Sequence, residues 1–269
     1  MNSTVTESSV AHVLGEALET ADDGLFVVAP DAETIAGLVE VMDAESPSVR
    51  LLAEPTALKD VMADFLVASR AANHVEAGVL EIRTYDEGTN ALLITGTSVV
   101  AIVRAADRVA GLTTDDEAFL ESANDRFSSV WDDAEPYHLR TPPIDRIRET
   151  LRSELGDATA DDFDAVLSSL ETARGDSDEL DEVTISLLVA AKNEDLLYDI
   201  SKWGENVGIA SKATFSRTKT RLEEAELIDT EKVPIDVGRP RLRLKLLDER
   251  LREASDDEFA SVPGSPPTA

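Results

Sequence analysis

The chain has 269 residues and no cysteine, which excludes disulfides, thiol catalysis and cysteine-ligated zinc or iron–sulfur centres. It carries 55 acidic and 25 basic residues, a formal charge of −30, and the acids are spread along the chain rather than gathered in one tail. No apolar run reaches the roughly 18 residues of a membrane helix, and the first residues lack the basic and apolar parts of a secretory leader, so we expect a soluble, cytoplasmic protein with no membrane partner.

The type of charge is as informative as its amount. Only seven of the 25 basic residues are lysine. A folded chain that is acid-rich almost throughout and poor in lysine is typical of a salt-loaded cytoplasm, where the Debye length falls to about 3 Å in molar salt and repulsion is screened. We therefore expect a halophilic host.

The first part of the chain, residues 1–140, alternates between two patterns. Short apolar or alternating runs predict strands at 25–28, 49–52, 79–83, 91–94 and 99–103. Amphipathic spacing predicts helices at about 31–42, 55–72 and 115–131. The last two strands flank a Thr-Gly-Thr-Ser turn and should form a hairpin. This order predicts an acidic α/β sensor-like domain with a mixed sheet.

Residues 141–178 have a different pattern. Pro142 and Pro143 mark a boundary, after which apolar residues recur at helical spacing until Gly156. Thr159 and Asp162 resemble a capping box at the start of a second helix that runs to about residue 174. We expect this segment to be a helical linker that transmits signals or dimerises.

Residues 179–254 predict a winged helix-turn-helix. A largely apolar helix begins near 180, a second covers about 195–203, and a third, capped by Ser211, covers about 212–225. Two alternating strands follow, at 227–233 and 242–246, joined by a Gly-centred tip. Residues 255–269 are acidic and then rich in proline, and we expect a disordered tail there.

Charge singles out the same segment. Residues 1–178 have a net charge of −24, whereas residues 201–245 have a net charge of +3 and hold five of the seven lysines. The positive charge is concentrated in two acid-free stretches, 211–222 and 237–247, each with four bases. Cations gathered on the third helix and the hairpin, against the trend of the chain, indicate contact with a polyanion.

The third helix has two unlike sides. Phe215, Thr218 and Leu222 fall on one face, and small, hydroxyl-bearing and basic residues occupy the other. The N-terminal residues of such a helix can enter a major groove, while arginines on a hairpin can meet phosphates or a narrow minor groove. The candidate DNA-binding residues are Ser211, Lys212, Thr214, Ser216, Arg217, Lys219, Thr220, Arg221, Arg239, Arg241 and Arg243.

The stretch from Ile209 to Ile228 resembles the third-helix signature of prokaryotic winged-helix regulators, and the Gly238-Arg239-Pro240 tip is similar to their wing. Glu226 departs from that pattern, because such proteins often have glycine at this position. The resemblance implies the usual groove insertion, with a helix exit that differs.

Residues 1–140 are similar in element order to the phospholipase-D-like domain of TrmB-type archaeal regulators. Asn90, Leu92 and Thr97 stand where that superfamily has His, Lys and Asp, so the resemblance implies a catalytically inert domain. The whole chain resembles the haloarchaeal TbsP-like regulators, which are associated with TrmB and central carbon metabolism. This implies a metabolite-sensing role but names no ligand.

The leading hypothesis is therefore a homodimeric regulator that binds double-stranded DNA and controls carbon-metabolism genes in response to a small-molecule metabolite or a partner. We expect a dimer because one winged helix reads few base pairs. We expect no catalytic residue, metal site or cofactor, since His12, His74 and His138 are far apart and the sequence has no phosphate-binding glycine motif.

Two alternatives stay open. One is an enzyme, anchored to nucleic acid, that acts on a phosphorylated metabolite or a phosphodiester; the sequence shows no nucleophile and base pair to support it. The other is a winged helix that binds proteins and never touches DNA. Such modules usually lose the basic helix face that this chain keeps.

Overall fold

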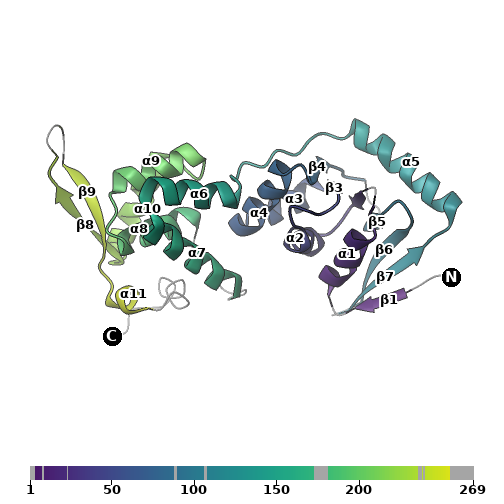
Figure 1. The fold of residues 1–269 in the computed structure, drawn as a ribbon, viewed down its shortest axis with the longest axis horizontal. Helices are drawn as coiled ribbons and strands as arrows, with labels where there is room; N and C mark the ends of the chain where they lie inside the picture. Colours follow the sequence, from purple (N-terminus) through teal and green to yellow (C-terminus); the bar gives the residue numbers. More distant parts are fainter. Residues whose placement is uncertain are drawn as a thin grey trace. The chain divides into compact units, whose positions relative to one another are not determined.

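The computed structural model divides the chain into two compact units, Met1–Pro143 and Ile144–Ala269 (Figure 1). It describes residues 4–254 apart from 8, 23, 88–89, 106–107, 173–180, 236–237 and 239. The division falls directly after the Pro142-Pro143 pair. The tail expected at 255–269 lies outside the described residues.

The first unit contains a seven-stranded mixed sheet. Its strands are β1 (Thr4–Glu7), β2 (Leu25–Val28), β3 (Val49–Ala53), β4 (Leu80–Thr84), β5 (Leu92–Ile94), β6 (Val99–Ala105) and β7 (Arg108–Thr114). They lie in the order β1-β7-β6-β5-β2-β3-β4. Strands β2, β3 and β4 are parallel, whereas β5, β6, β7 and β1 continue the sheet in antiparallel pairs. The predicted mixed α/β architecture is confirmed.

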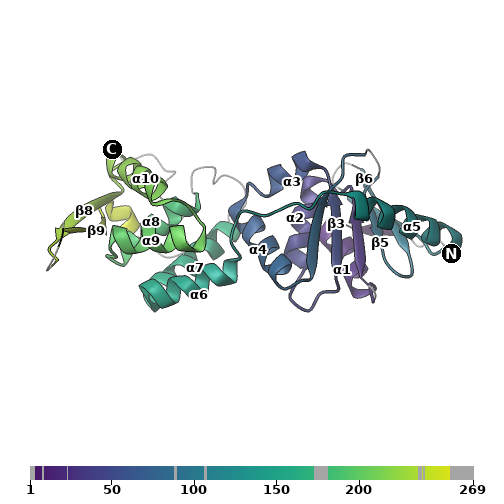
Figure 2. The ribbon, with the colours of Figure 1, turned by 90° about the horizontal axis from the view of Figure 1, so that it is seen from above.

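Helices cover the two faces of this sheet unequally (Figures 1 and 2). They are α1 (Val10–Glu19), α2 (Ala32–Val41), α3 (Pro55–Val61), α4 (Phe65–Glu76) and α5 (Glu117–Asp133). The first four bury one face, with Leu14 and Leu38 in the same apolar cluster as Val27 and Leu51. Helix α5 packs on the other face, where the ring of Trp131 meets that of Phe26 edge to face at 5.9 Å. Apolar burial on both faces is what holds this unit together.

Two parts of the first unit differ from the sequence prediction. The single helix expected at 55–72 is divided into α3 and α4, because the Asp64 carboxylate accepts hydrogen bonds from the backbone amides of Leu66 at 2.9 Å and Val67 at 3.2 Å and so starts a new helix. The sequence analysis assigned no element to residues 4–19 or 108–114. The structure places β1, α1 and β7 there, and β7 joins the hairpin to β1 at the sheet edge.

The second unit is a helical bundle with a β-hairpin. Its elements are α6 (Ile144–Leu155), α7 (Asp157–Thr172), α8 (Glu182–Lys192), α9 (Leu197–Val207), α10 (Lys212–Glu224), β8 (Ile228–Val233), β9 (Arg241–Leu246) and α11 (Glu249–Glu253). Helix α8 is central, since its residues 183–191 are all buried and it contacts α7, α9, α10 and β9. Figure 2 shows α6 and α7 on the side of this unit opposite α10.

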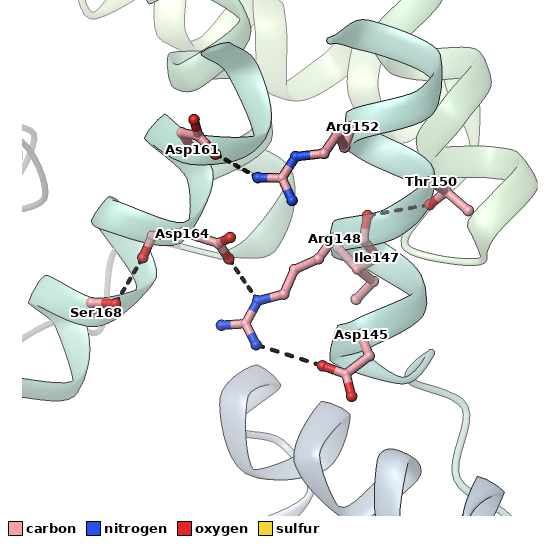
Figure 3. A network of polar contacts seen from close by, with 8 residues as sticks. All are labelled: Asp145, Ile147, Arg148, Thr150, Arg152, Asp161, Asp164 and Ser168. Carbon is pink, nitrogen blue, oxygen red and sulfur yellow. Dashed lines mark hydrogen bonds and ion pairs between the residues drawn. The ribbon is translucent and has the colours of Figure 1, made fainter. Parts of the chain in front are cut away.

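The segment expected as a separate helical linker is packed into this bundle. Trp203 of α9 is fully buried, its ring lies edge to face with Phe163 of α7 at 6.5 Å, and its indole Nε1 donates to the Thr150 hydroxyl of α6 at 3.0 Å. Figure 3 shows that Arg148 and Arg152 of α6 bind carboxylates of α7. Helices α6 and α7 are therefore structural parts of the second unit.

The capping box expected at Thr159 and Asp162 is wrong. Helix α7 already begins at Asp157, after Gly156 with a φ of +104°. The Thr159 hydroxyl donates to the Asp195 carboxylate at 2.8 Å, and Asp162 accepts from the Lys192 ammonium at 2.8 Å. Both side chains join α7 to the end of α8 rather than capping their own helix.

Candidate nucleic-acid interface

The turn between α9 and α10 is a helix-turn-helix connection. Gly208 ends α9 with a φ of +97°, a left-handed conformation that glycine adopts at little cost. The amides of Gly208 and Ile209 both donate to the Gly204 carbonyl, at 3.2 and 2.8 Å. Three residues after Gly208 the predicted cap is confirmed, because the Ser211 hydroxyl accepts from the amide of Thr214 at 3.2 Å. This short turn fixes the direction in which α10 leaves.

Apolar packing fixes the rotation of α10 about its own axis. Phe215, Thr218 and Leu222 are buried, at the spacing expected for one helix face. The ring of Phe215 lies so close to Gly204 of α9 that a Cβ at that glycine would overlap it. The opposite face of α10 consequently turns away from the bundle.

That outward face carries a cation without a neutralising carboxylate. Ser216, Arg217 and Thr220 are exposed. The Arg217 guanidinium donates to the Thr214 hydroxyl at 3.3 Å, and within the described part of the chain no carboxylate pairs with it. Glu224 is exposed seven residues further along the same face. The outward face is therefore positive toward the start of α10 and negative toward its end.

Lys212 is exposed on the flank of α10 and is already paired. Its ammonium lies 2.6 Å from the Glu205 carboxylate of α9. The hydrogen bond from Lys212 lowers the pKa of Glu205, and the same bond raises the pKa of Lys212. The two side chains bridge the helix-turn-helix connection.

Lys219 and Arg221 are not part of the outward cationic group. The Lys219 side chain is only 13% exposed and its ammonium lies 2.7 Å from Glu223. Arg221 donates to the Thr184 hydroxyl of α8 at 2.9 Å, with Asp181 3.8 Å away. The sequence pattern grouped these two bases with Arg217, whereas in the fold Lys219 pairs within α10 and Arg221 bonds to α8.

The hairpin places its arginines in three different situations. Arg241 at the start of β9 lies 3.2 Å from the Asp199 carboxylate and stacks over the Tyr198 ring at 4.3 Å. Arg243 is partly exposed and stands opposite Glu231 in the β8–β9 pair, close enough for its charge to act on that carboxylate. Arg239, expected at the hairpin tip, lies outside the described residues.

A groove of about 420 Å³ lies between α9, the start of α10 and the tip end of the β8–β9 hairpin. Its lining includes Tyr198, Ser201, Lys212, Ser216, Arg241 and Leu242. Tyr198 is 46% exposed, so its ring forms an open wall of this groove. Sequence reasoning missed Tyr198 and Ser201, although an aromatic residue at an outward position of α9 was the signal that could have identified them.

The chain leaves α10 through a turn that keeps the backbone conformation usual for glycine, although the residue there is Glu226. Glu226, where a glycine would be usual, has a φ of +57°. This left-handed conformation costs a residue with a Cβ about 1 kcal/mol or more relative to glycine. The sequence predicts a different helix exit at Glu226. The structure instead keeps the left-handed turn, at a steric cost to Glu226.

Metal-ligating clusters and membrane-spanning helices bear on the alternative functions. In the part of the chain that the structure describes, no group of three or more metal-ligating side chains lies together. None of the described helices has both the length and the apolar character needed to cross a bilayer.

Two family models match the chain and together cover most of it. One is the N-terminal domain of TbsP-like transcriptional regulators, over residues 2–142, and the other is their C-terminal helix-turn-helix domain, over residues 143–263. No curated protein matches. Among solved structures, the chain is similar to TrmBL2, described as an archaeal chromatin protein with a novel mode of DNA binding, at 16% identity and a TM-score of 0.37. That match covers 51% of this chain and 54% of TrmBL2.

Proposed function

We propose that this chain, which belongs to the TbsP-like transcriptional regulators, binds double-stranded DNA in a sequence-specific manner through α10 and the β8–β9 hairpin. The observation that carries the proposal is Arg217. It stands on the exposed face of α10 without a carboxylate partner among the described residues, in a chain whose formal charge is −30. A cation left unneutralised in so acidic a protein favours an anionic partner.

The geometry supports insertion of the first half of α10 into a major groove. An arginine can donate two hydrogen bonds to the O6 and N7 atoms of guanine, and the hydroxyls of Ser216 and Thr220 can bond base edges or phosphates. Glu224 keeps the second half of the same face away from the backbone by repulsion. The hairpin arginines, Arg241 and Arg243, would meet phosphates beside the groove.

The charge balance of the chain shapes this interaction. Because the chain as a whole repels DNA, attraction comes from the local surface of α10 and the hairpin. In the salt-rich cytoplasm that the composition favours, phosphate contacts lose much of their strength. Base-edge contacts and the shape of the DNA would then supply a larger share of the binding free energy.

The first unit has a sensor role in this proposal. The β5–β6 hairpin next to β2 supports the phospholipase-D-like resemblance, and Leu92 of β5 and Thr97 of its turn leave the catalytic positions of that superfamily without Lys and Asp. An inert domain of this kind would bind a metabolite or partner rather than turn over a substrate. Dimerisation is included because paired half-sites multiply the specificity of one winged helix.

The test uses the full-length protein and a DNA duplex selected from genomic fragments for its binding to the protein; this is the selected duplex below. Replacing Arg217 by alanine should weaken binding to the selected duplex by roughly 10- to 100-fold, the value of a good bidentate base contact. The control is Arg126→Ala on α5, which removes another exposed arginine, from the first unit, and should leave the affinity unchanged. Fluorescence anisotropy measures both. Unchanged affinity in Arg217→Ala would remove α10 from the proposed interface.

A further inference from the structure

Two cations that line the groove are each bound by a carboxylate from α9. The Lys212 ammonium lies 2.6 Å from Glu205, and the Arg241 guanidinium lies 3.2 Å from Asp199. Both cations line the groove between α9, α10 and the hairpin. Both carboxylates stand partly exposed, at 45% and 42%. The groove therefore has its positive charge neutralised in advance by one helix of its own unit.

Arg217 differs from these two cations. It has a hydroxyl partner, Thr214, and no carboxylate partner in the described residues. A nucleic acid can meet Arg217 at once, but it reaches Lys212 or Arg241 only by replacing a carboxylate with a phosphate. Of these three cations, Arg217 is immediately available, and Lys212 and Arg241 are available by exchange.

The exchange is physically feasible at both positions. A carboxylate oxygen at 2.6 to 3.2 Å from a cation occupies the place that a phosphate oxygen would take. Ion pairs that are this exposed are weak, so a phosphate held nearby by other contacts can displace the carboxylate. Arg241 also stacks over the Tyr198 ring at 4.3 Å, which keeps its guanidinium in the groove whichever anion it binds.

We propose that Asp199 and Glu205 determine specificity by competing with DNA phosphates for Arg241 and Lys212. The inference rests on the proposed function and deepens it. Binding to unrelated sequences depends almost entirely on phosphate contacts, so the competition lowers that affinity most. Binding to the operator also has base contacts from α10, which hold the phosphates in place while the carboxylates are displaced. The two acids therefore widen the gap between specific and non-specific binding.

The test measures the full-length Asp199→Asn and Glu205→Gln variants, singly and together, on the selected duplex and on a shuffled duplex of the same composition. Each single variant should raise the affinity for the shuffled duplex roughly two- to fivefold, the range expected from an exposed ion pair, and raise operator affinity less. Over a series of salt concentrations, the slope of log K against log salt should steepen by up to about 0.9 for each freed cation. Melting curves establish that the variants are folded.

The matched control is Asp157→Asn. It removes the same charge and an aspartate–arginine pair with the same 3.2 Å separation, but on α7, across the bundle from α10 (Figure 2). If this control raised the affinity equally, the effect would be one of net charge and the inference would be overturned. Wild-type values for the shuffled duplex in both α9 variants, or a loss of affinity, would overturn it as well. Failure of the wild-type chain to bind any duplex would overturn the proposed function itself, which is a distinguishable result.

Discussion

Helices α6 and α10 belong to the same unit, have similar lengths and carry arginines, yet they use them differently. On α6, Arg148 lies 2.6 Å from Asp164 and 3.6 Å from Asp145, and Arg152 binds Asp161 (Figure 3). Arg152 also binds Asp157. On α10, Arg217 meets only the Thr214 hydroxyl among the described residues. A count of arginines therefore does not distinguish the two helices, whereas the pairing of Arg217 differs from that of Arg148 and Arg152.

The neighbours of each helix explain this difference. Helix α6 packs against α7, a helix rich in aspartate, so its arginines find their counter-charges inside the fold. Helix α10 is attached through buried Phe215 and Leu222, and its polar face has no helix opposite it within the described unit. The arginines of α6 therefore contribute to stability, and Arg217 remains available for binding.

Among the variants that test this contrast between α6 and α10, Gly204→Ala should have the largest effect. The new methyl group would overlap the Phe215 ring, and either α10 or the ring must move. Overpacking of this kind costs about 2–3 kcal/mol of unfolding free energy. We expect urea denaturation to show this loss. Tryptophan fluorescence can monitor the two units separately, because each unit holds one tryptophan, Trp131 and Trp203. DNA affinity should fall together with the order of α10.

The control is a glycine of another helix. At Gly15 of α1 an added Cβ meets nothing within 4 Å, so Gly15→Ala should increase stability by about 0.5–1 kcal/mol through its better helix propensity. Equal behaviour of the two variants would contradict the close approach of α9 and α10.

A variant of α6 with a smaller expected effect tests the contrast between α6 and α10 directly. Arg148→Ala should reduce the unfolding free energy by about 0.5–1 kcal/mol, because the side chains of the Arg148–Asp164 ion pair are 37% and 33% exposed and solvent weakens the pair. It should leave DNA affinity at the wild-type value. Urea denaturation and fluorescence anisotropy on one preparation separate the two effects. A loss of affinity equal to that of Arg217→Ala would show that pairing does not distinguish the two helices.

Much of the second unit was predictable because local periodicity sets it. The spacing of Phe215, Thr218 and Leu222 defines the buried face of α10, and Ser211 marks its start. The pairing of its cations was not predictable, because the partners of Lys212 and Arg241 stand on α9 and meet them only in the folded unit. Sequence alone treats both Arg217 and Arg241 as cations available to DNA, and only the fold shows that Arg241 is paired with Asp199.

The first unit shows the same limit on a larger scale. The buried strands β2 and β3 and the hairpin β5–β6 follow from apolar runs and a turn. Strand β7 contains few large apolar residues and becomes a strand through its pairing with β6 and β1, which is a long-range effect. The break at Asp64 was missed because helical spacing continues across it, although the Asp64 side chain could have been interpreted as a cap.

Asp195 is the converse of Arg217, a carboxylate that has a hydroxyl partner and, among the described residues, no cation. Burial raises the pKa of Asp195, the charge of Asp199 raises it further, and the hydrogen bond from Thr159 opposes both. The folded state therefore binds this proton more tightly than the unfolded state. The contribution of Asp195 to the unfolding free energy falls as pH rises from the ordinary pKa of 3.8 through the raised pKa of the folded state. Above that interval the loss of stability is complete.

The smallest predicted effect follows from the raised pKa of Asp195. Asp195→Asn keeps an acceptor for Thr159 and carries no charge, so its stability relative to the wild type should grow as pH rises from about 4 and then level off above the folded pKa. Thr159→Val removes the bond that lowers the pKa of Asp195 and should widen the interval. Urea denaturation at a series of pH values gives both difference curves. If the Asp195→Asn curve is flat across this range, Asp195 does not titrate as an unpaired carboxylate, and the contrast between paired and unpaired charges would apply to the arginines alone.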